Sequence, residues 1–218
     1  EAAGGTVAEG YRYEAATSDF STATSAISQQ IDALVTGGTP QSEIAVYAAA
    51  FDEIVDVFHR AQSLPTLTGT AWYGSDGVAL TSALVGDAPA AAVAAGVGYP
   101  NPIFGLKDAL APKWGPVSKV IQKRTGIVPD AFALSAYDAL FVARAALRKT
   151  NGLQNFAKFK AAFLRQSRRF SGVTGSTALD ATGDRQNGGF DFWAVRSVNG
   201  SYGWVRTGTY DDGVLTVF

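Results

Sequence analysis

The sequence predicts an α/β protein whose core is a doubly wound parallel sheet. Between residues 6 and 99, apolar runs of strand length alternate with stretches in which apolar residues recur at helical spacing. Such alternation implies right-handed βαβ units, in which each helix crosses between two parallel strands. The run Glu43–Ala49 is almost unbroken in its apolar character, which is typical of a strand covered on both faces.

Local signals place the individual elements of the first hundred residues. Residues Glu1–Gly5 have the pattern of a last helical turn and its glycine stop, and Thr17-Ser18-Asp19 supplies a helix cap. Asp52 and Glu53 lie in a first turn, where the helix dipole favours acidic residues. The predicted strands are Thr6–Tyr13, Glu43–Ala49, Thr66–Tyr73 and Pro89–Tyr99. The predicted helices are Phe20–Leu34, Phe51–Gln62 and a short one that follows the Gly74–Gly77 turn and ends near Val85.

From Pro100 onward, prolines and glycines divide the chain into shorter pieces, and helical patterns dominate. The predicted helices are Pro116–Thr125, Asp130–Lys149 and Leu153–Gln166. The second of these carries an apolar face made of Phe132, Ala136, Ala139, Leu140, Ala143 and Leu147. Basic residues gather at Lys158, Lys160, Arg165, Arg168 and Arg169. We interpret this cluster as a solvated helix face, because no aromatic or glycine interleaving indicates a nucleic-acid surface.

The last fifty residues have the pattern of strands and turns. Val173–Leu179 is a short extended run, and Asp180–Asp184 is a tight turn in which Gly183 is free to adopt a positive φ. Two strands, Phe190–Val198 and Tyr202–Tyr210, flank Asn199-Gly200, a dipeptide typical of a hairpin turn.

Composition and motifs exclude several classes of function. The 218-residue chain has a net charge of −1 and no cysteine, which gives no electrostatic footprint for nucleic acid and no thiol chemistry. No P-loop or complete dinucleotide motif is present, so we expect no cofactor. The sequence has no pattern of metal ligands either, and Asp180–Asp184 lacks the spacing of a calcium loop. The single histidine, His59, lies in an amphipathic helix and is expected to be exposed rather than catalytic.

Five short motifs, in this order along the chain, resemble those of the type I periplasmic solute-binding proteins of ABC importers, the leucine/isoleucine/valine-binding family. They are Thr17-Ser18-Asp19-Phe20-Ser21; Gly74-Ser75-Asp76-Gly77; Pro129-Asp130-Ala131-Phe132 with Ala136-Tyr137-Asp138-Ala139; Gly172-Val173-Thr174-Gly175; and Asp180-Ala181-Thr182-Gly183-Asp184-Arg185. The resemblance implies two α/β lobes joined by crossing strands, with ligand between them, and covers the second half of that fold. Residues 1–99 would then form lobe II, residues 100–188 an incomplete lobe I, and residues 189–218 strands that cross back to lobe II.

The resemblance also implies a function and a site. The chain would belong to an extracytoplasmic component that binds an amino acid or a related small polar solute and delivers it to the membrane permease. It would be periplasmic, or extracellular and membrane-anchored. Asp76 would hold the ligand's ammonium group, and Phe132 would form an aromatic wall. Ala50 stands before Phe51 where relatives carry a ligand-contacting tyrosine, which leaves more space. Tyr73 and Tyr99 would add aromatic walls.

Other interpretations remain open from the sequence. Asp76 could be a plain turn residue, and Phe132, Tyr73 and Tyr99 could be core residues. The same fold also serves as the ligand-binding domain of sensors and receptors, and an α/β enzyme is a further alternative. Because most of lobe I would be missing, we expect apolar surface of the Asp130–Lys149 helix to be exposed or covered by another copy, and the isolated chain to self-associate.

Overall fold

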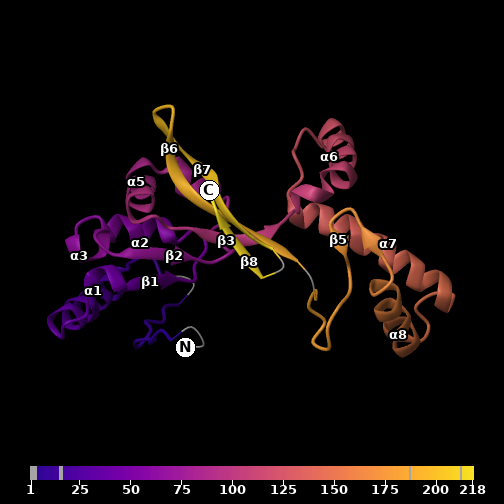
Figure 1. Ribbon diagram of the computed structural model, residues 1–218, viewed down its shortest axis with the longest axis horizontal. Helices are drawn as coiled ribbons and strands as arrows, with labels where there is room; N and C mark the ends of the chain where they lie inside the picture. Colours follow the sequence, from indigo (N-terminus) through magenta and orange to yellow (C-terminus); the bar gives the residue numbers. More distant parts are fainter. Residues whose placement is uncertain (1–3, 15–16, 187, 212) are drawn as a thin grey trace. The chain divides into compact units, whose positions relative to one another are not determined.

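The computed structural model describes residues 4–14, 17–186, 188–211 and 213–218, and these form two compact units (Figure 1). Unit 1 comprises Glu1–Pro102 and Trp193–Thr207, and unit 2 comprises Ile103–Phe192 and Gly208–Phe218. The helix end expected at Glu1–Gly5 lies largely outside the described residues. The lobe boundaries expected from the family resemblance stay a prediction. Within the described residues, no helix combines the length and apolar character needed to cross a lipid bilayer.

Unit 1 contains a parallel strand pair, β1 (Ala45–Ala48) and β2 (Ala71–Gly74), with an apolar core that includes helical residues on one of its faces. The α/β class and the parallel pairing are thus confirmed. The helices are α1 (Ser21–Thr36), α2 (Ile54–Ala61), α3 (Pro65–Thr68), α4 (Ser82–Gly86) and α5 (Ala88–Val97), and Gln41–Glu43 is a 3₁₀ turn. Val46 and Trp72 point into an apolar core together with Ile54, Phe58, Leu67 and Leu84.

The other face of the strand pair is open, which corrects the expectation that Glu43–Ala49 is covered on both faces. Tyr47 and Tyr73 are aligned in register and exposed, and so are Ala45 and Ala71. Parallel strands are normally buried on both faces. The run is therefore more apolar than its burial among the described residues requires.

Residues 89–99, expected to be a strand, mostly form helix α5. The Asp87 side chain caps the helix by accepting a hydrogen bond from the Ala90 N–H, and Pro89 occupies the first turn, where its missing N–H costs nothing. Gly98 ends the helix with a φ of 84°. His59 is half-buried rather than exposed, because its Nε2 lies 2.9 Å from the second carboxylate oxygen of Asp87.

Two other expected strands are shorter or absent in the structure. Thr66–Tyr73 begins with helix α3, since Pro65 starts a helical turn, and only its end belongs to β2. Residues 6–13 are described as irregular chain and form no strand.

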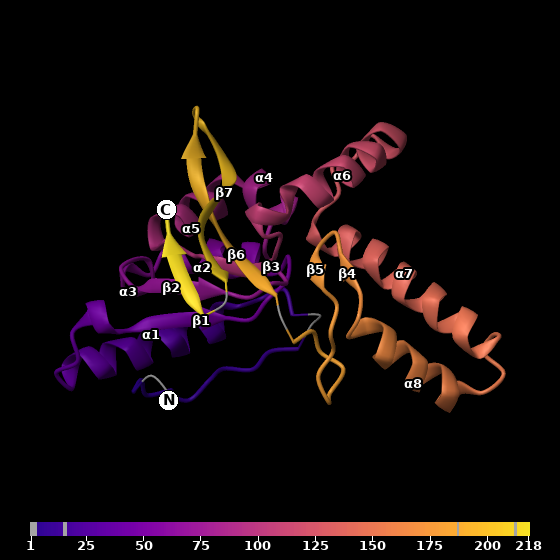
Figure 2. The ribbon, with the colours of Figure 1, turned by 45° about the vertical axis from the view of Figure 1, so that its right-hand side comes forward.

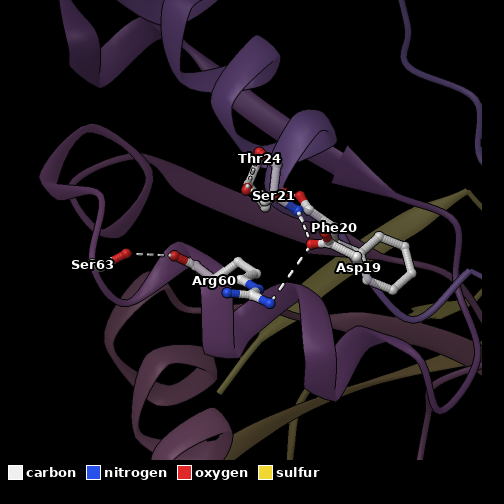
Figure 3. A network of polar contacts seen from close by, with 6 residues as sticks. All are labelled: Asp19, Phe20, Ser21, Thr24, Arg60 and Ser63. Atoms are coloured by element: carbon white, nitrogen blue, oxygen red, sulfur yellow. Dashed lines mark hydrogen bonds and ion pairs between the residues drawn. The ribbon is translucent and has the colours of Figure 1, made fainter.

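Helix α1 is joined to α2 by the residue expected to cap it (Figure 3). Asp19 accepts a hydrogen bond from the Ser21 N–H at 3.0 Å, and the Arg60 guanidinium lies 3.6 Å from the same oxygen. The backbone hydrogen bond lowers the pKa of Asp19, with a smaller contribution from the charge of Arg60. Asp19 thus binds the first N–H of α1, although Phe20 occupies the N-cap position and makes no side-chain capping hydrogen bond.

A second sheet has the strand order β3-β6-β7-β8. Its strands are β3 (Asn101–Gly105), β6 (Gly189–Val198), β7 (Ser201–Asp211) and β8 (Val214–Val217). The predicted hairpin between β6 and β7 is confirmed, since Asn199 and Gly200 have φ angles of 51° and 82°, as a type I′ turn requires. Strand β3 was not expected, because Pro100 and Pro102 suggested a break. It lies at an edge of the sheet, where proline is tolerated.

Unit 2 is built on three helices and a short hairpin. The helices are α6 (Ala111–Thr125), α7 (Ala131–Thr150) and α8 (Phe156–Ser167), and the hairpin strands are β4 (Ser171–Gly172) and β5 (Gly175–Ser176). The buried Asp138 carboxylate of α7 holds the hairpin turn by accepting hydrogen bonds from the Val173 N–H, the Thr174 N–H and the Thr174 hydroxyl. The predicted turn at Asp180 is also present, because Asp180 accepts hydrogen bonds from the N–H groups of Thr182, Gly183 and Asp184.

Helix α7 has a buried face and a separate, exposed apolar face. The buried face consists of Leu134, Asp138, Val142 and Ala146, spaced four residues apart. The apolar face predicted from the sequence is a different one. On it, Phe132 is 50% exposed and Leu140 is 66% exposed, and Ala136 and Ala139 are exposed as well. The expected exposure of apolar surface on this helix is therefore present.

Candidate functional site

The candidate site lies at the carboxyl edge of the parallel strands β1 and β2. Because Ala48 and Gly74 are aligned in register, the turns that follow the two strands begin side by side. The Ser75 hydroxyl lies 3.4 Å from both the N–H and the carbonyl oxygen of Ala50, which links the two turns. This edge of an open α/β sheet is where ligands bind in such folds. The structure thus brings together the predicted residues Ala50, Phe51 and the turn that carries Asp76.

Phe51 packs against the turn that carries Asp76. A methyl group added to Gly77 would come within 2.6 Å of the Ala50 carbonyl oxygen and 3.0 Å of two ring carbons of Phe51. Glycine is therefore needed for the ring to approach the turn so closely. The Phe51 side chain is nonetheless 70% exposed, and Asp76, the residue before Gly77, is exposed as well. An exposed aromatic ring and an exposed carboxylate at the same edge of the sheet can both attract a ligand cation.

The other predicted unit 1 residues differ in accessibility. Tyr73 is exposed on the open face of the strand pair, so it is available as an aromatic wall. Ala50 is buried, and it contributes its backbone to the link between the turns. Tyr99 is 0% exposed and packs edge-on against Phe58, with ring centroids 5.0 Å apart. Its burial raises the pKa of its hydroxyl, which has no hydrogen-bond partner among the described residues. The structure therefore places Tyr99 in the supporting core.

A pair of residues that sequence reasoning missed braces the first turn. Tyr13 donates a hydrogen bond to a carboxylate oxygen of Glu53 at 2.7 Å, and the Phe51 N–H donates to the same oxygen at 3.1 Å. Burial and the negative charge of Glu53 raise the pKa of Tyr13 to about 12. Burial acts to raise the pKa of Glu53, but its hydrogen bonds outweigh burial and lower it. An ionised Glu53 thus fixes the backbone at Phe51.

The remaining predicted residue, Phe132, belongs to helix α7 of unit 2. Among the described residues, no group of three or more His, Asp or Glu side chains is arranged to hold a metal ion. Asp180 uses its carboxylate within its own turn.

The chain has the fold of solved solute-binding proteins, over about half of their length. A structure of a leucine-binding protein from Thermotoga maritima matches 92% of this chain with 51% of its own, at 19% identity and a TM-score of 0.61. A solute-binding protein from R. palustris in complex with 4-hydroxybenzoate matches 98% of this chain with 54% of its own, at 15% identity and a TM-score of 0.65.

A substrate-binding protein of an ABC transporter from Desulfitobacterium hafniense, in complex with Leu, matches 84% of this chain with 48% of its own. The identity is 14% and the TM-score 0.53. No protein-family model and no curated protein sequence matches the chain. The fold expected from the motifs, that of the type I periplasmic binding proteins, is therefore confirmed.

Proposed function

We propose that this chain, which has the fold of the type I periplasmic binding proteins, is part of an extracytoplasmic solute-binding component of an ABC importer. The observation that carries the proposal is the pair of linked turns at the carboxyl ends of β1 and β2, which presents Asp76 and Phe51 to solvent. The similar solved structures, described as ABC transporter solute-binding or leucine-binding proteins, support the same function. The permease subunits of the importer would be its protein partner.

The proposed ligand carries a cationic amine, as an amino acid does. Asp76 attracts an ammonium group and repels a carboxylate, and Phe51 offers a ring face for the same cation. Among the similar structures, one holds Leu and another 4-hydroxybenzoate. An aromatic acid without an amine would gain nothing from Asp76. The charge at the turn therefore favours an amino acid over a benzoate.

The proposed action is binding without bond making or breaking. Ligand contacts would favour a closed arrangement of the two lobes over an open one, by as much as the ligand binds the closed form more tightly. The closed form would then be presented to the permease. Such a component works on the outer side of the membrane, which is the location we propose.

Replacing Asp76 by asparagine should weaken leucine binding by a polypeptide that carries both lobes. Closure of the two lobes over the ligand would bury the pair of Asp76 and the ammonium group. Removing one partner of a buried charged pair costs about 2–5 kcal/mol, so we expect at least about a 30-fold loss of affinity by calorimetry. Binding of 4-hydroxybenzoate, titrated in parallel, should not weaken. The fold should be unaffected, because asparagine is also well tolerated in such turns.

Asp56→Asn is a matched control, since Asp56 is an exposed residue of helix α2. It removes the same charge from the same unit and should leave the affinity for leucine unchanged. Unchanged leucine affinity in Asp76→Asn would reduce Asp76 to a turn residue and remove the chemical basis of the amino-acid proposal.

We also propose that the isolated chain self-associates through the exposed apolar face of α7. Leu140→Glu places a charge in that face and should shift the chain toward the monomer in light scattering at rising concentration. Arg165→Glu, at an exposed position of helix α8 in the same unit, is the control for a charge change alone. A wild-type chain that stays monomeric over the same concentrations would contradict this proposal.

A further inference from the structure

The charge of the chain is distributed very unevenly. No acidic residue occurs between Asp138 and Asp180, whereas the same segment contains eight basic residues. They are Arg144, Arg148, Lys149, Lys158, Lys160, Arg165, Arg168 and Arg169. The net charge of −1 for the whole chain conceals this basic segment, because acidic residues elsewhere compensate for it.

The structure gathers these cations on the hairpin formed by α7 and α8. The two helices run antiparallel and side by side, joined by residues 151–155 (Figure 2). All eight basic side chains are exposed. Within the described parts of the chain, none of the eight forms an ion pair. Their charge is therefore available to a partner outside the hairpin.

Exposed apolar side chains lie among the cations at the connecting end of this hairpin. Leu153 is 59% exposed and Phe156 is 69% exposed, between Lys149 on one side and Lys158 on the other. Along α8 follows an apolar groove of about 290 Å³, lined by Phe156, Phe159, Lys160, Phe163 and Leu164. The end of the hairpin thus combines apolar side chains that face water with basic residues around them.

We propose that the connecting end of the α7–α8 hairpin, residues 148–160, is a peripheral binding surface for an anionic phospholipid bilayer. Four to eight Lys or Arg residues on an amphipathic element are typical of surfaces that bind anionic lipid headgroups. Phenylalanine and leucine beside them can enter the boundary between headgroups and acyl chains. A nucleic acid would use the cations but would leave Leu153 and the apolar groove without a role. The proposal is independent of the solute site, since it uses none of its residues.

The test is co-sedimentation of the 218-residue chain with vesicles. Phosphatidylcholine vesicles containing phosphatidylglycerol should bind the chain, and pure phosphatidylcholine vesicles should not. Raising the salt concentration should release it, because the Debye length falls from about 10 Å at 0.1 M to about 3 Å at 1 M. Each cation near an anionic surface is worth about a fivefold change in partitioning. Lys158→Gln/Lys160→Gln should therefore lower binding by about 25-fold.

Two further double variants separate the contribution of charge to vesicle binding from that of side-chain insertion. Lys158→Arg/Lys160→Arg keeps the charges and should bind as the wild type does. Leu153→Ser/Phe156→Ser keeps every cation and should also weaken binding, because it removes the inserted side chains. Circular dichroism of each variant checks that the helices remain.

Three outcomes would overturn the proposal. The first is equal binding to neutral and anionic vesicles, which would indicate apolar adsorption alone. The second is an unchanged affinity in the folded Lys158→Gln/Lys160→Gln variant. The third is stronger binding to single-stranded DNA than to phosphatidylglycerol, which would assign the surface to nucleic acid.

Discussion

Gly172→Ala is expected to destabilise unit 2 by about 3 kcal/mol or more. A methyl group at this position would lie 2.1–2.2 Å from three carboxyl atoms of Asp138, which is buried. Either the carboxylate moves and gives up its hydrogen bonds to Val173 and Thr174, or the backbone of β4 moves. Both routes combine overpacking with the loss of charge-assisted hydrogen bonds, each worth about 1–3 kcal/mol. Urea unfolding of the 218-residue chain measures the loss.

Hydrogen exchange locates this effect in the structure. The Val173 and Thr174 amides, protected in the wild type by Asp138, should exchange faster in the variant. Ser171→Ala is the neighbouring control and should change stability by no more than about 0.5 kcal/mol, because Ser171 is exposed. Wild-type unfolding and wild-type amide protection in Gly172→Ala would show that the Asp138 contact does not hold this turn.

Gly74→Ala should have a similarly large effect on unit 1. The added methyl group would lie 1.8 Å from the side-chain oxygen of Asn101 and 2.8 Å from the ζ-carbon of Tyr99, and both side chains are completely buried. Neither can swing into solvent, so the strand end must shift, at a cost of about 3 kcal/mol. Urea unfolding is again the measurement. Gly96→Ala is the control, because its methyl group meets open space in helix α5 and should stabilise by up to about 1 kcal/mol.

A double variant tests the cause assigned to Gly74→Ala. Asn101→Ala alone should destabilise, because it removes the hydrogen bond from the Asn101 amide to the Tyr99 carbonyl oxygen. Combined with Gly74→Ala, however, it vacates the space that the new methyl group needs. We expect the double variant to be more stable than the sum of the two losses by about 1–2 kcal/mol. Strict additivity would mean that the overlap with Asn101 is not what destabilises the strand end.

Features that depend on local chemistry could be predicted from the sequence. In the turn at Asp180–Asp184, Gly183 adopts a positive φ and Asp180 accepts hydrogen bonds from nearby N–H groups. Both effects operate within five residues. Asn199-Gly200 specifies a hairpin in the same way. Helix α7 is 20 residues long, so its helical periodicity can be recognised in the sequence.

Elements without a periodic pattern were harder to predict. Helix α5 is alanine-rich and apolar on every side, so its residues give neither a helical nor a strand period. The useful signal was local: Asp87 as a cap and Pro89 in the first turn. Strand β3 contains Pro102, which the sequence alone could not assign to a sheet edge.

The position of the candidate site could be predicted from the sequence, but the buried and hydrogen-bonded residues that support it could not. Phe51 and Asp76 follow predicted strand ends, and parallel strands bring such positions together. The bond between Tyr13 and Glu53 joins residues 40 apart, and no local pattern indicates it. Tyr99 shares its residue type with Tyr73, yet one is buried and the other exposed, because burial depends on the tertiary neighbours of each.

The two-faced helix α7 has a consequence for how substitutions would be tolerated. Changes at Val142 disturb the folding of this chain, since that side chain is buried. Changes at Leu140 leave the folding of this chain almost untouched, because that side chain faces water. In a mutational scan scored for folding, Leu140 should thus accept polar residues freely. In a scan scored for the self-association proposed above, it should behave as a core position. A difference between the two scans at Leu140 would identify the exposed face of α7 as one that packs against a second copy of the chain.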